Sequence, residues 1–329
     1  MTSYGYVIPS FGPFADPGAV VDLLQAGESL GYDDVWFGDH VVVPSYAAAL
    51  TQPDWLEPLT ACFLGLGRTT RLRFGTDVLV APYRNPVLVA KMVATADHLS
   101  GGRLTLGVGV GYLRGEFAAL GADYANRGAV TDEFLRVLRL LWESKGSVSY
   151  AGDHVSFEDV VFGPAPVQQP IPLWVGGNVP RALRRAADLG DGWHPLFPTP
   201  EQYAEARSSI SERRGPNAAP FTYSYSCAVT TLLDEEPTDF TAGTWDELDD
   251  IPDDFSYAPP LPTTAEGRPR FLGTPEQVAG DIQAYVDAGV EHFTLRFANG
   301  GPGVGVDDML AQMQRFMAEV APAVRTTSA

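Results

Sequence analysis

The sequence contains few of the residues that build covalent cross-links or metal sites. Only two of its 329 residues, Cys62 and Cys227, are cysteines. Cys62 falls in an apolar helical stretch and Cys227 in a predicted strand, so we expect two buried thiols rather than a disulfide. The five histidines do not occur at ligand spacing with one another or with a cysteine; they are His40, His98, His154, His194 and His292. The sequence therefore predicts no metal site.

Positive charge and long apolar runs are also lacking. Against 41 acidic residues there are 22 lysines and arginines, which gives a net charge of −19. Binding to nucleic acid or to an anionic membrane needs a positive field, so both partners are excluded. No apolar run approaches the ~18 residues of a membrane span. The segment Met1–Tyr4 lacks the basic head of a signal peptide, so we expect a soluble, cytoplasmic protein.

The segment Arg71–Phe117 is the most informative part of the chain. An apolar run, Leu72–Val80, is followed by a helical pattern that Gly101 and Gly102 end, and a second apolar run, Arg103–Val108, follows at once. Continuous apolar runs that alternate with helices are typical of a parallel sheet covered by helices. This segment therefore predicts two buried parallel strands and their crossover helix.

Strands of this kind recur about eight times, with helical patterns between nearly all of them. They are predicted at Tyr4–Pro9, Val35–Gly38, Leu72–Val80, Arg103–Val108, Leu173–Val175, Gly192–Leu196, Phe221–Thr230 and His292–Phe297. This count predicts an α/β fold, a (β/α)₈ TIM barrel that spans residues 1–329 as one domain. A doubly wound sheet is the alternative, but its dinucleotide fingerprint is missing from the first strand-to-helix turn, Ile8–Pro13.

Three insertions interrupt the regular alternation, at about residues 42–55, 146–170 and 233–270. The second is predicted to hold a short hairpin. The third is rich in acidic residues and prolines, which favours either a solvated loop or a lid over the site.

In such a barrel the active site lies at the carboxyl ends of the strands. Asp39 and His40 directly follow a predicted strand, where they could transfer a proton or hold a polar ring. Asp77 is a lone carboxylate in an apolar strand and is costly to bury without hydrogen bonds. Glu57 precedes a predicted helix start, so a role in stabilising the helix end is the alternative to catalysis there.

Two glycine-rich turns could lie against a ligand. Gly107, Gly109 and Gly111, with Val110 between them, leave the end of the fourth strand without bulky side chains, so that a flat ring could approach the backbone. At the next turn, Gly176 and Gly177 precede Asn178, which we interpret as the N-cap of a helix. The free N–H groups of such a helix start suit a phosphate.

These motifs together resemble the bacterial-luciferase superfamily of flavin enzymes, and within it the deazaflavin F420-dependent oxidoreductases. The resemblance rests on Trp36–His40, Phe74–Val78, Leu106–Gly111, Leu173–Asn178 and Leu189–Trp193. It implies hydride transfer between F420 and a small organic substrate, with His40 near the reacting ring. It also implies a non-proline cis peptide at Asp77–Val78 behind that ring. In the sugar-phosphate dehydrogenases of this branch a glutamate follows the last glycine, and Tyr112 replaces it here, which argues against a sugar phosphate.

The resemblance leaves alternatives open. One is a monooxygenase that uses reduced FMN and oxygen, and another is a barrel subunit without catalysis. The partners that the resemblance implies are a separate flavin or F420 reductase and further copies of the chain in a homo-oligomer. Further candidates near the site are Trp55, Trp193 and His194. An anionic cofactor needs cations near the binding face, and those available are Arg84, Lys91, Arg114, Arg127, Arg181, Arg184, Arg185 and Arg296.

Overall fold

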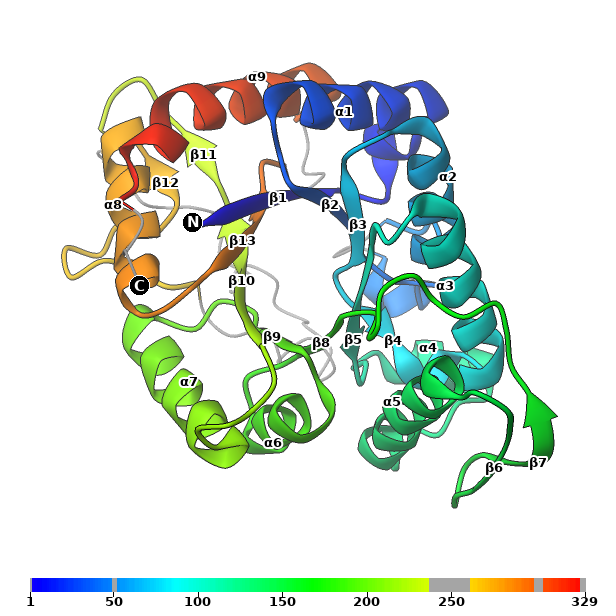
Figure 1. Ribbon diagram of the computed structural model, residues 1–329. Helices are drawn as coiled ribbons and strands as arrows, with labels where there is room; N and C mark the ends of the chain where they lie inside the picture. Colours follow the sequence, from blue (N-terminus) through cyan, green and yellow to red (C-terminus); the bar gives the residue numbers. More distant parts are fainter. Residues whose placement is uncertain (1, 49–51, 237–260, 299–303, 326–329) are drawn as a thin grey trace.

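The computed structural model describes residues 2–48, 52–236, 261–298 and 304–325, and shows a closed ring of parallel strands surrounded by helices (Figure 1). The strand order is β3-β2-β1-β13-β10-β9-β8-β5-β4, and pairing of β3 with β5 closes the ring. The strands are β1 Ser3–Ile8, β2 Asp34–Phe37, β3 Arg73–Thr76, β4 Leu79–Val80, β5 Leu104–Gly109, β8 Leu173–Gly176, β9 Gly192–His194, β10 Thr222–Val229 and β13 His292–Arg296. Both β3 and β4 pair with β5 and occupy one position in the ring, so the nine strands fill eight positions. The predicted (β/α)₈ barrel is confirmed.

The helices cover the outside of this ring. They are α1 Pro17–Leu30, α2 Pro58–Arg68, α3 Pro86–Ser100, α4 Arg114–Leu120, α5 Arg127–Glu143, α6 Pro180–Leu189, α7 Pro200–Arg214, α8 Pro275–Asp287 and α9 Val306–Arg315. Most of them begin at a proline, whose fixed φ suits the first helical position. Several also have a side-chain cap, such as Asp16 on α1 and Asn85 on α3. Helix α3 ends at Gly101 in the left-handed conformation, as predicted.

The insertions differ in what can be described. Within 146–170, the strands β6 (Ser147–Ala151) and β7 (Ser156–Val161) form the predicted antiparallel hairpin. Its turn is held by Glu133 of α5, whose carboxylate accepts the backbone N–H groups of Asp153, His154 and Val155. The insertion at 233–270 lies between two short strands that pair with each other, β11 (Thr231–Leu232) and β12 (Leu272–Gly273). Residues 49–51 and 237–260 lie outside the described residues. The predicted loop or lid at 233–270 falls mostly on the second of these ranges.

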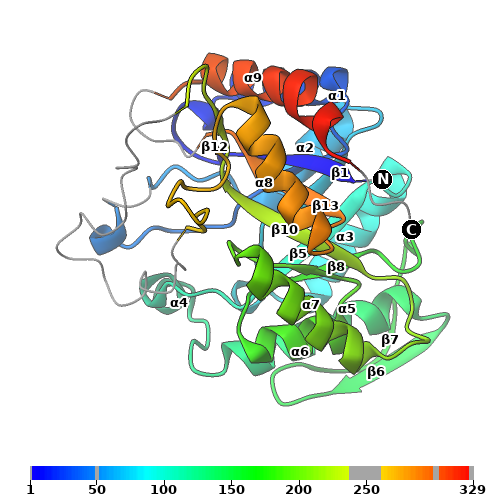
Figure 2. The same cartoon turned by 90° about the vertical axis from the view of Figure 1, so that its left-hand side faces the viewer.

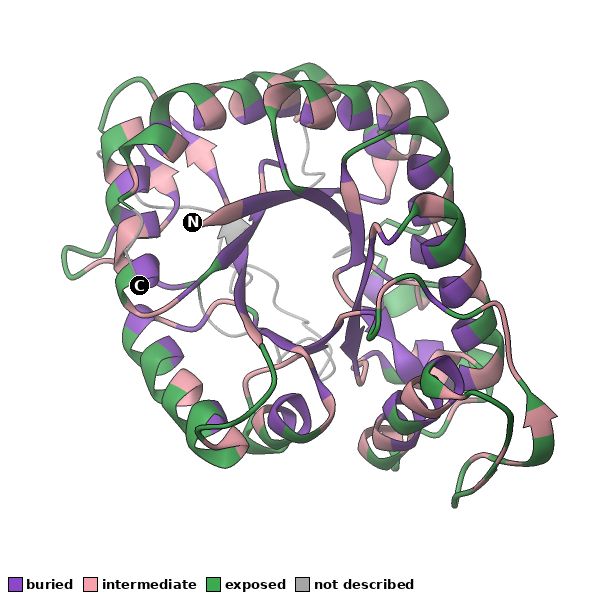
Figure 3. Ribbon diagram, in the orientation of Figure 1, coloured by how far each residue is buried: buried purple, intermediate pink, exposed green. Residues whose placement is uncertain are grey.

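The apolar core lies between the strands and the helices (Figure 3). Outward-facing side chains such as Tyr6, Phe74 and Leu106 are fully buried there. Cys62 and Cys227 belong to this layer and are free and buried, as predicted. No helix among the described residues is long and apolar enough to cross a membrane.

Aromatic rings occupy the middle of the barrel interior, where Val7 of β1 packs with Trp36 and Trp174. Trp36 of β2 stacks on His194 of β9, with ring centroids 4.9 Å apart, and on Trp174 of β8 at 5.1 Å. Glycines on neighbouring strands make room for these rings: a Cβ at Gly75 would lie 2.3 Å from Trp36, and one at Gly192 would lie 2.5 Å from Trp174. The stacked rings fill the centre of the barrel. The polar side chains of the candidate site lie at the carboxyl ends of the strands.

Below the stack, Asp34 accepts a hydrogen bond from the Trp36 indole N–H at 2.5 Å. Burial raises the pKa of Asp34 to about 7 and lowers that of His292 to about 3. His292 is therefore neutral at neutral pH, and its 3.4 Å contact with Asp34 is not an ion pair.

Candidate active site

The carboxyl ends of the strands meet on one side of the barrel, the side on which Figure 2 shows α4. The polar segments predicted from the sequence follow these ends: Asp39 and His40 follow β2, Asp77 lies between β3 and β4, and Asn178 follows β8. Residues from distant parts of the chain are thus brought to one mouth. Among the described residues, no group of three or more His, Cys, Asp or Glu is arranged to hold a metal ion.

The strand formed by β3 and β4 is interrupted by a bulge. On the β3 side Gly75 pairs with Thr105, whereas on the β4 side Leu79 pairs with Val108, so the interrupted strand has one extra residue. The extra residue falls at Asp77–Val78, and the peptide bond between these two is cis without a proline. The resemblance predicted this cis peptide, and the structure confirms it.

The glycines of β5 and β8 make space for this bulge. A Cβ at Gly107 would lie 2.0 Å from the Thr76 carbonyl oxygen, and one at Gly109 would lie 2.5 Å from Val78 Cγ2. At Gly176 the same Val78 side chain would be 3.3 Å away. The missing side chains therefore have a structural cause in addition to the expected approach of a flat ring. Contact of Gly107, Gly109, Val110, Gly111 and Gly176 with a cofactor stays a prediction.

Gly107→Ala is expected to lower the free energy of unfolding by about 1–3 kcal/mol, because the new methyl group would meet a backbone oxygen that cannot rotate away. Urea titration of the purified protein measures the change. Gly67→Ala is the matched control: Gly67 lies in α2 with no atom within 4 Å of an added Cβ. There the substitution should raise stability by about 0.5–1 kcal/mol. An equal effect at both positions would show that the bulge tolerates a side chain on β5.

Asp77 is the centre of a buried polar cluster. Its carboxylate lies 2.9 Å from His194 Nε2 and 3.4 Å from the Ser226 hydroxyl, and it forms an ion pair with Arg296. Burial alone would raise the pKa of Asp77, but the charge of Arg296 and the His194 hydrogen bond lower it to about 2. His194 Nδ1 is in turn 2.7 Å from the Ser224 hydroxyl. The Asp77 carboxylate, which stands alone in an apolar stretch of the sequence, therefore has three polar side-chain partners. These contacts hold the bulge from inside the barrel.

Asp39 anchors the other end of the bulge. Its carboxylate accepts the backbone N–H of Val80 at 2.7 Å and both terminal nitrogens of Arg84, at 2.6 and 2.9 Å. Burial raises the pKa of Asp39, and Arg84 opposes that shift. Arg84 also donates to Glu57 at 2.9 Å. Asp39 thus connects the end of β2 to the start of α3.

Glu57 is engaged at the start of α2. One carboxylate oxygen accepts from the Thr60 N–H and hydroxyl, at 2.7 and 2.8 Å, while the other accepts from Arg84. Burial raises the pKa of Glu57, but these hydrogen bonds outweigh it and the net shift is downward. An ionised carboxylate with both oxygens occupied is a poor proton donor, which favours the helix-end interpretation of Glu57.

His40 is held by a glutamate that the sequence analysis did not single out. His40 Nδ1 lies 3.0 Å from Glu116 Oε2, and Nε2 lies 3.3 Å from the Tyr112 hydroxyl. Glu116 is buried, and it also accepts from the backbone N–H of Val41 and from the Tyr83 hydroxyl. Burial raises the pKa of Glu116, but the His40 contact and these hydrogen bonds lower it overall. An ionised Glu116 places a proton on Nδ1 and directs Nε2 towards Tyr112.

The turn after β8 differs from its prediction in one respect. The N-cap of α6 is Val179, and Asn178 lies one residue before it. The Asn178 side chain instead donates to the Leu196 carbonyl at 2.6 Å and accepts the Leu196 N–H at 3.2 Å. The N-cap assignment of Asn178 was therefore wrong, because its amide ties this turn to the segment after β9. Gly177 has φ +107°, a conformation that favours glycine. A Gly177→Val substitution would therefore strain the backbone as well as obstruct the predicted phosphate site at this turn.

The aromatic candidates divide between the mouth and the core. Trp55 packs edge-on against His40, with centroids 4.7 Å apart, and so lines the mouth. Trp193 is fully buried and donates its indole N–H to the Gly177 carbonyl at 2.9 Å. It supports the β8–α6 turn from the core. Lys91, one of the cations considered for an anionic cofactor, lies over the Phe162 ring beside the β6–β7 hairpin.

A closed parallel barrel with charged and aromatic side chains at the carboxyl ends of its strands is the architecture of the (β/α)₈-barrel enzymes. The chain belongs to the luciferase-like monooxygenase family, whose sequence profile matches residues 3–292. This membership confirms the family predicted from the motifs.

One relative and two solved structures are similar to this chain over nearly its whole length. An F420-dependent glucose-6-phosphate dehydrogenase of Amycolatopsis mediterranei (strain U-32) is 26% identical over 331 residues, which cover 94% of this chain and 95% of the relative. A solved F420-dependent secondary alcohol dehydrogenase in complex with an F420-acetone adduct has a TM-score of 0.76 at 21% identity, covering 98% and 99% of the two chains. The monooxygenase RslO1 from Streptomyces bottropensis has a TM-score of 0.73 at 20% identity, covering 97% and 99%.

Proposed function

We propose that the protein is an F420-dependent oxidoreductase that passes hydride between the deazaflavin and a small alcohol or its carbonyl form. The observation that carries this proposal is the pairing of His40 with Glu116 beside the Asp77–Val78 bulge, at the carboxyl ends of the strands. The similarity to F420-dependent dehydrogenases over 94% of the chain supports the choice of cofactor.

The residues at the mouth fit such a cofactor. Val179 provides no side-chain cap to α6, and Asn126 provides none to α5. In α6 the N–H groups of Ala182 and Leu183 donate to the Val179 carbonyl, so within the described residues the Arg181 N–H is the first-turn donor left for another acceptor. Arg127 and Arg181 lie in these first turns and add positive charge. This donor set suits the cofactor phosphate, next to the turn that holds Gly176 and Gly177.

The chain's own groups would orient the substrate and manage its proton. The bound deazaflavin would accept or deliver the hydride. His40 Nε2 and the Tyr112 hydroxyl face each other at 3.3 Å, where they could share the oxygen of an alcohol or carbonyl substrate. His40 would take up or return the hydroxyl proton at Nε2, while Glu116 stabilises the protonated imidazole through Nδ1. Burial raises the pKa of Tyr112, so its hydroxyl remains a donor.

The second candidate function is oxygenation with reduced FMN, which the family membership and the likeness to a monooxygenase structure favour. Both cofactors contain a flat tricyclic ring and a phosphate, so the bulge and the β8–α6 turn suit either. A separate reductase and a homo-oligomer remain predictions in both cases.

Titration with F420 and with FMN side by side tests the proposal. We expect saturable, micromolar binding of F420, seen as a change in its fluorescence, with FMN bound more weakly. The expected preference rests on the charged tail that F420 has and FMN lacks. Tight binding of FMN with no binding of F420 would contradict the deazaflavin proposal and leave the family membership intact.

A further inference from the structure

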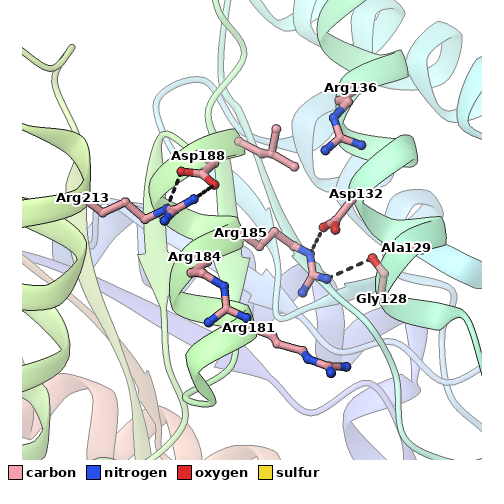
Figure 4. A pocket seen from close by; sticks show the side chains of 10 residues that line it. Gly128, Ala129, Asp132, Arg136, Arg181, Arg184, Arg185, Asp188 and Arg213 are labelled. Atoms are coloured by element: carbon pink, nitrogen blue, oxygen red, sulfur yellow. Dashed lines mark hydrogen bonds and ion pairs between the residues drawn. The ribbon is translucent and has the colours of Figure 1, made fainter.

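A surface hollow of about 310 Å³ lies outside the barrel, between α5 and α6. Arginines from three helices line it: Arg136 of α5, Arg181, Arg184 and Arg185 of α6, and Arg213 of α7. Figure 4 shows these side chains around the hollow, with Asp132 and Asp188 as the acidic residues among them. So many like charges in one concave site stand out in a chain with a net charge of −19.

The two acidic residues neutralise only part of this charge. Arg185 is buried, pairs with Asp132 and donates to the Gly128 carbonyl at 2.9 Å, so it joins α6 to the start of α5. Arg213 pairs with Asp188. Within the described ranges, the side chains of Arg136, Arg181 and Arg184 take part in no ion pair or hydrogen bond. The hollow therefore presents three unpaired guanidinium groups, which match carboxylates in charge and geometry.

The hollow begins next to the turn assigned to the cofactor phosphate. Helix α6 starts at Pro180, directly after that turn, and Arg181 and Arg184 lie in its first two turns. Each helical turn rises about 5.4 Å, so these arginines lie within roughly 10 Å of the helix start along its axis. An extended chain covers about 3.3–3.6 Å per residue, so a tail of a few residues spans that length.

We propose that this hollow, the arginine hollow, binds the carboxylates of the acidic glutamate tail of F420 as the tail leaves the phosphate turn and crosses the outer edge of the barrel. The inference rests on the proposed function, and it adds a physical reason for the protein to bind F420 in preference to FMN. FMN ends at its phosphate and has no tail carboxylate to pair with Arg136 or Arg184. The arginine hollow thus favours the tailed deazaflavin over a flavin that the mouth alone would accept.

The test compares F420 with a tail-less form that keeps the phosphate, by fluorescence titration of the full-length protein. The wild-type protein should bind tailed F420 roughly tenfold more tightly, as expected for two or three exposed arginine–carboxylate pairs. In the double variant Arg136→Gln/Arg184→Gln the ratio should fall close to one, with the affinity for the tail-less form unchanged. Neither side chain has a partner within the described residues, so the variant should fold normally.

The double variant Arg68→Gln/Arg325→Gln is the control, because it removes the same charge from exposed positions outside the hollow. It should keep the wild-type ratio. Equal binding of both forms by the wild-type protein would overturn the proposal while leaving F420 dependence intact. Equal weakening of both forms in the hollow variant would assign the arginines to the phosphate and also overturn it. If neither form bound the wild-type protein, the proposed function would fail, and this proposal with it.

Discussion

His40→Ala is expected to lower turnover by about 10²–10⁴-fold and to change cofactor affinity little. A positioned acid or base contributes about this factor when it moves a proton in the transition state. Cofactor binding, in contrast, is spread over the ring, the phosphate and the tail, so one imidazole accounts for little of it. The measurement is kcat on a processed alcohol together with a fluorescence titration of F420. His154→Ala, an exposed histidine near the hairpin turn, is the matched control and should behave like the wild-type protein.

The partner of His40 provides a sharper form of this prediction. Glu116→Gln retains a side chain of the same shape but removes the charge 3.0 Å from Nδ1. A neutral partner stabilises the protonated imidazole less, so the pH profile of kcat should move to lower pH while the fold is retained. A purely structural role of Glu116 would change stability without moving the profile. If His40→Ala kept wild-type turnover and pH profile, the proton donor would have to be sought at Tyr112 or elsewhere at the mouth.

The barrel could be predicted from the sequence because its signals are local. The apolar runs alternate with helical patterns, and turn residues separate them, so each predicted strand has a counterpart within one or two residues of its bounds. The break inside Leu72–Val80 is the exception. An apolar run does not show that its middle leaves the sheet, and only the resemblance placed a cis peptide there.

The partners of the site residues could not be predicted in the same way. Asp39 and His40 were found because they follow a strand, but Glu116 resembles any acidic residue in the first turn of a helix. Its role depends on the fold of the segment Tyr112–Glu116 back over the end of β2, a contact across 76 positions of sequence. Asn178 was misassigned for a related reason: its spacing fits an N-cap, while the Leu196 backbone that engages it is distant in sequence.

Asp77→Ala is expected to lower the free energy of unfolding by about 3–5 kcal/mol, because it leaves the buried end of Arg296 without its counter-charge. Asp77→Asn retains the shape and should cost less. Asp22→Asn, an exposed carboxylate on α1, is the control and should change stability by less than about 0.5 kcal/mol. Urea titrations at neutral pH compare the three variants. A loss below about 1 kcal/mol in Asp77→Ala would show that the Asp77 cluster does not support the bulge.

The same cluster predicts how stability depends on pH. The folded-state pKa of Asp77 is about 2, below its unfolded value of about 3.9. A lowered pKa means that the ionised carboxylate stabilises the fold above the unfolded value, and that this contribution disappears as the pH falls from about 4 to about 2. The shift corresponds to about 2–3 kcal/mol. The wild-type protein should therefore lose stability more steeply than Asp77→Asn over this interval, and the two curves should converge at its acid end. Parallel curves would mean that Arg296 and His194 do not hold Asp77 ionised, and the bulge would then need another support.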